Sequence, residues 1–223
     1  MPRNNRDGSS RKSRDSLRRR EPDLGYYLIV TDAEHTEENY VLGLRDSLPE
    51  ELHGRIVIKT EQSRLDKIVS RAKTLASFNP QYAETWIVFD RDRVVNFDQI
   101  ISQAEKEEIN VGWSNPCLEI WFDAYFETMH HYNDSVSCCR GFARTFERKT
   151  MHRYEKNTRD IYSLLTQFGD EENAVRIAEN RYQQHLREGK QFPSEMCPCT
   201  TVYQLVGEIK SRTSKNQNIF SES

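Results

Sequence analysis

The chain has 223 residues, of which 36% are hydrophobic, 10% aromatic and 30% charged, and its formal net charge is −3 at pH 7. So many aromatic side chains exclude a disordered protein, and the length suits one large domain or a domain with a helical appendage. No apolar run approaches the roughly 18 residues of a membrane span, and the arginine-rich start lacks the apolar stretch of a secretory signal. We therefore expect a cytoplasmic protein without a membrane partner.

The first twenty residues are strongly basic. They hold eight Arg or Lys and two Asp, while the whole chain carries −3. The positive charge is therefore concentrated at this end, and we expect residues 1–22 to form a flexible basic tail. Such a tail either contacts nucleic-acid phosphates or an acidic partner, or only keeps the chain soluble.

The cysteines do not form a recognisable metal-binding pattern. Their number is odd and the chain has no secretory signal, so reduced thiols are expected. Cys-Cys and Cys-x-Cys spacings with scattered histidines differ from the spacings typical of zinc sites, which leaves a zinc site as the less favoured alternative. The five are Cys117, Cys138, Cys139, Cys197 and Cys199.

The first half of the chain alternates short apolar runs with segments of helical periodicity. Residues 26–30 and 55–59 predict strands, and residues 37–48 and 65–78 carry apolar side chains at helical spacing. Thr36 is placed to cap the first of these helices with its hydroxyl group.

A third apolar run, residues 86–89, predicts a central strand that is buried on both faces. A helix over 97–109 and a short strand over 109–113 follow. The alternation of strands and helices predicts an α/β fold with a compact, largely parallel sheet and right-handed crossovers. Pro116 suits the first turn of the next helix, residues 118–126, with Ser114 or Asn115 as its cap.

The rest of the chain is expected to be helical. Segments 142–146, 159–168 and 173–185 have helical character, residues 192–201 predict an irregular loop, and residues 202–209 predict a last helix. We divide the chain into the basic tail 1–22, an α/β core 23–130, a helical part 131–210 packed on the core, and a polar tail 211–223.

Two acids follow the central strand directly. Ligands of open α/β sheets bind at the carboxyl ends of the strands, and Asp90 and Asp92 point to the same side of an extended backbone. Such a pair suits a hard cation such as Mg²⁺. The alternative is a turn whose acids are solvated or paired with Arg91 and Arg93.

Further acids should converge on the same edge. Asp32 follows the first strand, and Glu119 lies at a helix start, where it either caps the helix dipole or points into the cluster. Three or four carboxylates would hold a divalent metal, which stabilises phosphoryl transfer. The absence of G-x-x-x-x-G-K-[ST] and G-x-G-x-x-G motifs argues against an ATPase or a dehydrogenase and favours phosphodiester chemistry on a polymer.

Several motifs together resemble the RloB family, which has a Toprim-like fold, and they follow one another along nearly the whole chain. They are L-I-V-T-D-A-E-H-T-E-E-N-Y (28–40), V-F-D-R-D-R (88–93), W-S-N-P-C-L-E-I-W (113–121), Y-x-K (154–156) and P-C-T-T-V-x-x-L-V (198–206).

The resemblance implies a Toprim-like core with a helical C-terminal extension, in which an acid after the first strand and the D-x-D acids bind Mg²⁺ or Mn²⁺. It also implies an effector of bacterial anti-phage, abortive-infection defence, encoded beside an ABC- or AAA-type ATPase. The expected activity is a metal-dependent nuclease acting on RNA, such as tRNA, or on DNA. The sequence leaves room for a homodimer.

One departure from the family pattern bears on activity. Where the family has T-E-G-E-K-T-E, residues 31–37 read T-D-A-E-H-T-E, so Asp32 replaces a glutamate and the glycine is lost. The carboxylate reach falls by one methylene, about 1.5 Å, which a metal shell with bridging water absorbs more readily than a general acid or base does. The alternative function is therefore a catalytically weakened binding or regulatory subunit of an ATPase-containing defence complex.

The expected roles fall into two groups, and some residues also have an ordinary structural interpretation. Glu37 suits a helix N-terminus, Lys156 a solvated surface, and Ser114 and Asn115 a helix cap. On the catalytic hypothesis, Asp32, Asp90 and Asp92 hold the metal, Asp32 also serving as acid or base. Glu34, Glu37 and Glu119 complete the shell, and Arg93, Ser114, Asn115 and Lys156 contact the nucleic acid.

Overall fold

In this computed structural model the described residues are 25–32, 35–61, 64–79, 81–92 and 94–220, with side chains described as far as Thr213. The predicted basic tail 1–22, Glu34 and Arg93 lie outside the described residues. Within the described ranges no helix is both long and apolar enough to cross a membrane.

The described residues form a five-stranded sheet in the order β2-β1-β3-β4-β5. The first four strands are parallel, as predicted, and β5 is antiparallel to β4. β5 lies in the segment predicted as an irregular loop, and two residues are too few to show strand periodicity. The strands are β1 Tyr26–Thr31, β2 Ile56–Thr60, β3 Tyr82–Asp90, β4 Asn110–Asn115 and β5 Cys199–Thr200.

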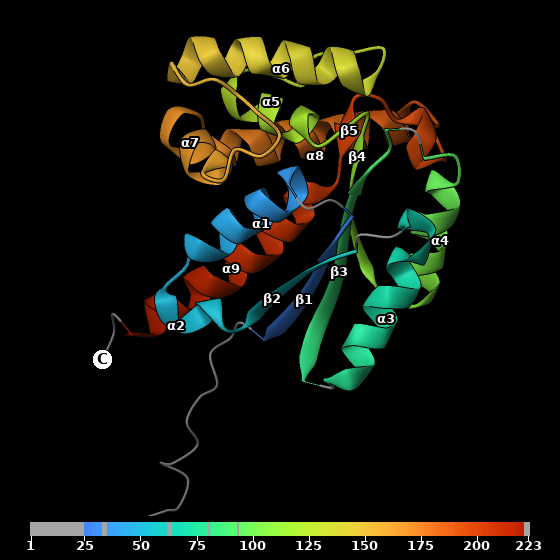
Figure 1. Cartoon of the computed structure of the whole chain (residues 1–223), viewed down its shortest axis with the longest axis vertical. Coiled ribbons are helices and arrows are strands. Elements are labelled where there is room, and N and C mark those ends of the chain that lie inside the picture. The colour runs from blue at the N-terminus through green and yellow to red at the C-terminus, as the bar shows by residue number, and fades with distance from the viewer. Residues whose placement is uncertain (1–24, 33–34, 62–63, 80, 93, 221–223) are drawn as a thin grey trace, which may run out of the picture.

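Helices cover both faces of the sheet (Figure 1). One hydrophobic core contains Leu28 and Ile87 with α3 and α4, and the other contains Ile29 and Val88 with α1 and α9. Alternate residues of β1 and β3 thus enter opposite cores, which explains why these strands are apolar throughout. The helices on the two faces of the sheet are α1 Thr36–Asp46, α2 Glu50–His53, α3 Ile68–Phe78, α4 Phe97–Lys106 and α9 Val202–Phe220.

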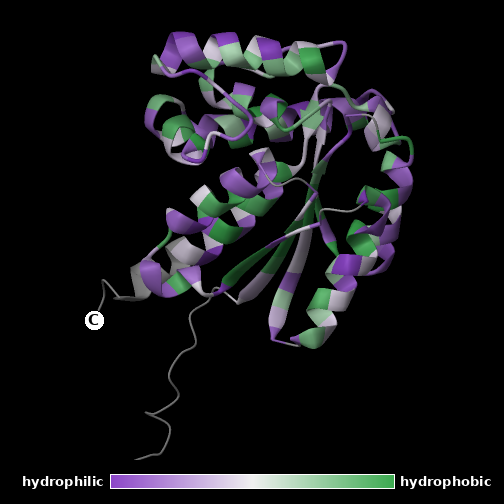
Figure 2. Cartoon of the chain, in the orientation of Figure 1, coloured by the Kyte–Doolittle hydropathy of each residue, from purple (hydrophilic) through white to green (hydrophobic). Residues whose placement is uncertain are grey.

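Four more helices gather beyond the carboxyl ends of the parallel strands, at the top of Figure 1. Their apolar side chains, Trp121 and Phe142 among them, belong to the same core as α1 and α9. Figure 2 shows hydrophobic residues along much of the central strands and a mixture of hydrophilic and hydrophobic residues along the helices. These helices are α5 Glu119–Phe126, α6 Ser135–Thr150, α7 Ile161–Phe168 and α8 Glu171–Arg187.

Several predicted helix ends are wrong. His35 precedes α1 as its N-cap, and the Thr36 hydroxyl instead donates to the backbone oxygen of Lys156, 3.2 Å away. Ser114 and Asn115 end β4 instead of capping α5, which begins at Glu119. α9 continues to Phe220, through most of the segment 211–223 predicted as a polar tail.

Gly43 sets how closely α1 and α7 pack. A Cβ atom at this position would overlap the Cβ of Tyr162, which lies too near its own backbone to turn away. We therefore expect Gly43→Ala to lower the free energy of unfolding by about 1–3 kcal/mol, although alanine favours helix formation by about 1 kcal/mol. Urea titration measures the change. Gly54→Ala is the control, because a Cβ there meets nothing within 4 Å; equal stability of the two variants would contradict the packing argument.

Candidate active site

The carboxyl ends of β1 and β3 bring three acids to one edge of the sheet. The two strands are parallel neighbours, with Thr31 opposite Val88. The backbone N–H of Asp32 donates to the oxygen of Val88 at 3.2 Å, so Asp32 leaves β1 beside the end of β3. Asp90 ends β3, and Asp92 follows two residues later.

Two further acids reach the same place from helices. Glu37 lies in the first turn of α1 and is 4% exposed, while Glu119 opens α5 and is 1% exposed. The Oε1 atom of Glu119 accepts a hydrogen bond from the Tyr154 hydroxyl at 2.8 Å. The charge of Glu119 contributes to raising the pKa values of Glu37 and Asp90, so this carboxylate lies near the other acids.

The pKa values show that these acids act on one another. Burial, followed by the charge of Asp90, raises the pKa of Asp32 well above its usual range. Burial, followed by Asp32, raises the pKa of Glu37 to about 8. Burial, followed by Glu37 and Glu119, raises the pKa of Asp90. We call this set the acidic cluster: Asp32, Glu37, Asp90, Asp92 and Glu119.

One oxygen of the acidic cluster lacks a partner. Among the described residues, Oδ1 of Asp32 is buried without a hydrogen bond. An unpaired buried carboxylate oxygen is costly, and a proton or a cation at this position would reduce the cost. Carboxylate oxygens are the ligands that hard divalent cations prefer, so the residue types of the acidic cluster suit such an ion.

Lys156 supplies positive charge to the acidic cluster. Its side chain is exposed. Partial desolvation of the ammonium works to lower its pKa, but Glu119, Cys139 and Asp90 outweigh that effect and raise it. The same charge lowers the pKa values of Asp32 and Glu37. Lys156 is thus an exposed lysine whose charge acts on the acidic cluster, and its contact with nucleic acid stays a prediction.

Ser114 and Asn115 frame the site. Each is 1% exposed. The Ser114 hydroxyl shares a hydrogen bond of 2.8 Å with that of Thr200, and the Asn115 amide donates to the backbone oxygens of Pro193 at 3.1 Å and Ser194 at 3.3 Å. These bonds hold the end of β4 against the segment around β5. The contact of Ser114 and Asn115 with nucleic acid stays a prediction.

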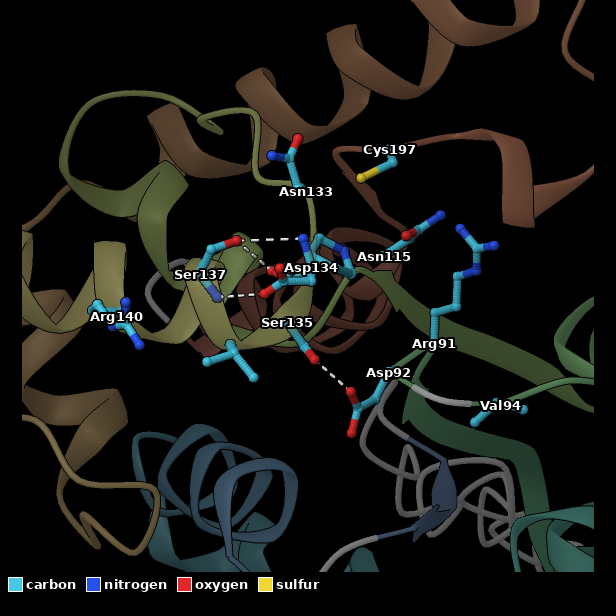
Figure 3. A pocket seen from close by; sticks show the side chains of 12 residues that line it. Arg91, Asp92, Val94, Asn115, Asn133, Asp134, Ser135, Ser137, Arg140 and Cys197 are labelled. Carbon is cyan, nitrogen blue, oxygen red and sulfur yellow. Dashed lines mark hydrogen bonds between the residues drawn. The ribbon is translucent and has the colours of Figure 1, made fainter.

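A pocket of about 620 Å³ opens beside Asp92 (Figure 3). The Ser135 hydroxyl donates to the Asp92 carboxylate from the start of α6. Arg91 and Arg140 line the same pocket, so both signs of charge face it. The sequence did not mark Ser135 or Arg140 as site residues, because neither their spacing nor their type distinguishes them.

A second potential ligand group adjoins the acidic cluster. One ligand atom each from Cys117, Glu119 and Cys139 lies within 4.8 Å of the others. The two Sγ atoms are 3.9 Å apart. The cysteine spacing did not predict this group, because its thiols come from a loop and a helix that meet only in the fold.

The buried carboxyl of Glu37 should make stability depend on pH. Its pKa rises from the usual 4.5 to about 8, so the unfolded chain ionises it more readily than the folded chain does. The stabilisation is fully present below pH 4.5 and is lost as the pH rises towards 8. Without metal, we expect the free energy of unfolding to fall by about 2–4 kcal/mol across this window.

Denaturant titrations at several pH values measure that slope. Glu37→Gln should flatten it, whereas Glu38→Gln, at the next position of α1, should leave it in place. An unchanged slope in Glu37→Gln would contradict the assignment.

Comparison with known proteins identifies the family. Searches of curated proteins and of solved structures gave no match. A family described as RloB-like protein matches residues 27–209, which include the strands and helices that carry the acidic cluster. The chain therefore belongs to the family of RloB-like proteins.

Proposed function

We propose that this protein is a metal-dependent nuclease that cleaves RNA, such as tRNA, or DNA as an effector of bacterial anti-phage defence. The observation that carries the proposal is the acidic cluster at the carboxyl ends of β1 and β3, with a buried Asp32 oxygen that has no hydrogen-bond partner among the described residues. Such a set of carboxylates suits Mg²⁺ or Mn²⁺.

The acids lie at different depths, which suggests different roles. Asp92 is exposed, Asp32 and Asp90 are partly buried, and Glu37 and Glu119 are buried. Asp32, Asp90 and Asp92 would hold the cation on the side that substrate reaches. Glu37 and Glu119 would act from behind, Glu37 holding a proton near neutral pH and Glu119 fixed by Tyr154. The bound cation would polarise the scissile phosphate and activate water.

The charges around the cluster favour a phosphodiester polymer as substrate. Arg91 and Arg140 line the pocket beside Asp92, and Lys156 lies within the field of Glu119 and Asp90. Cations next to a carboxylate metal site can steady the phosphates on either side of the scissile bond. The family resemblance supports the defence role and an ABC- or AAA-type ATPase as partner.

One observation favours a second function, a weakened binding or regulatory subunit of such a complex. Asp32 is shorter than the glutamate of the family pattern, and Ala33 replaces its glycine. A carboxylate that no longer reaches the reacting atoms could still bind a cation and preserve the fold.

Cleavage assays test the nuclease proposal. Purified protein is incubated with bulk tRNA, single-stranded RNA and plasmid DNA, with Mg²⁺ or Mn²⁺, alone and with the neighbouring ATPase. We expect cleavage of one substrate class, and a rate at least about 100-fold lower in Asp90→Asn, which loses a metal-holding charge. Asp46→Asn, at an exposed end of α1, should keep the rate. Failure of the unmodified protein to cleave any substrate would favour the regulatory function.

Metal binding can be measured without a substrate. A cation that binds only the folded chain raises stability, by about 2.7 kcal/mol at 100 times its Kd. We expect Mg²⁺ or Mn²⁺ to raise Tm, and to do so more at pH 8 than at pH 5, where protonated carboxyls compete. Asp90→Asn should lose most of the increase. An identical response in this variant would place the bound ion elsewhere.

A further inference from the structure

Three cysteines meet beside the acidic cluster without taking part in it. Cys117 lies between β4 and α5, and Cys138 and Cys139 are neighbours in α6. The thiols of Cys117 and Cys139 lie 3.9 Å apart, and the Cys117 thiol also donates to the backbone oxygen of Ser135 at 3.8 Å. The cysteines are free, so the thiols are available for other chemistry.

We propose that Cys117, Cys139 and Glu119 form a binding site for a thiophilic divalent cation, with Zn²⁺ as the expected ion. Two thiolates on a tetrahedral zinc, with bonds of about 2.3 Å, lie about 3.8 Å apart. The observed separation of the two Sγ atoms is 3.9 Å. Glu119 contributes an oxygen within 4.8 Å of both sulfurs. The three ligands therefore need only small side-chain shifts to surround an ion.

The ligand types distinguish this site from the acidic cluster. Thiolates select zinc and similar ions, whereas magnesium and calcium prefer oxygen ligands. Two sulfurs and one oxygen leave a fourth position, which water or the thiol of Cys138 can occupy. The site thus goes beyond the proposed nuclease function and shares only Glu119 with its residues.

The surrounding residues hold the three ligands in place, and an ion can reach the site from solvent on the side of Cys139. Cys117 and Glu119 are each 1% exposed, and Glu119 accepts the Tyr154 hydrogen bond at 2.8 Å. Cys139 is partly exposed and forms the accessible side of the site. Thiols bind zinc as thiolates, so we expect uptake of the ion to release two protons.

Cobalt titration tests the site, because Co²⁺ takes the same ligands as zinc and reports them in its absorption spectrum. The full chain, reduced and freed of metal, is titrated with Co²⁺ and then with Zn²⁺. We expect one equivalent of Co²⁺ per chain to produce a thiolate-to-cobalt charge-transfer band and the visible bands of a tetrahedral ion. Zn²⁺ should abolish these bands.

Variants identify the ligands. Cys139→Ser, at the partly exposed position, should remove the charge-transfer band or weaken binding at least tenfold, and Glu119→Gln should weaken binding while keeping the band. Cys197→Ser is the control, since its thiol faces the backbone oxygen of Tyr132. Asp90→Asn should also keep the cobalt spectrum, which separates this site from the nuclease proposal.

Three results would overturn the proposal. They are binding of Co²⁺ without a charge-transfer band, an unchanged spectrum in Cys139→Ser, and a Cys117–Cys139 disulfide that forms in place of metal uptake. In each case the cleavage and Tm measurements on Asp90→Asn still decide the nuclease function independently.

Discussion

Repulsion between buried carboxylates is the constraint on which this site depends. Asp32, Glu37 and Asp90 each have a raised pKa, and each is raised in part by another member of the group. Burial of several like charges is unfavourable, so the fold must supply enough stability elsewhere to hold them together. Protons or a bound cation would neutralise these charges. The folded protein is therefore less stable when the acidic cluster is fully ionised than when it is neutralised. Binding of a cation, as proposed above, would relieve this repulsion.

The rest of the fold keeps these acids from moving apart. Thr201 accepts a hydrogen bond from the backbone N–H of Trp113 at 3.0 Å and donates one to the oxygen of Val111 at 2.9 Å. These contacts secure β4 just before the chain turns towards Glu119. On the other side, the Thr36 hydroxyl holds the backbone of Lys156 close to the start of α1. All three hydrogen bonds are made to backbone atoms, so they hold the segments that carry the acids and not the carboxylates themselves.

The sequence predicted what periodicity and parallel-strand geometry determine. The apolar runs around Val30 and Val88 predicted the central strands. The rule that ligands bind at the carboxyl ends of strands predicted that Asp32 and Asp90 lie close together. Those parts depend on local patterns. β5 escaped prediction because two residues carry no periodicity, and the Glu119 orientation was open because a helix-start acid can face either way.

The cysteine group shows why the remaining features needed the structure. Cys117 and Cys139 lie close together because α5 packs against α6. The spacing of the cysteines along the chain does not predict this contact. The same packing puts Tyr154 on Glu119 and brings Lys156 into the field of both groups. Glu119 therefore belongs to both proposed ligand sets, one made of carboxylates and the other containing the thiols of Cys117 and Cys139. An ion bound to the thiols would engage this carboxylate and reduce its repulsion of Asp90, so the two sites should influence each other through a single side chain.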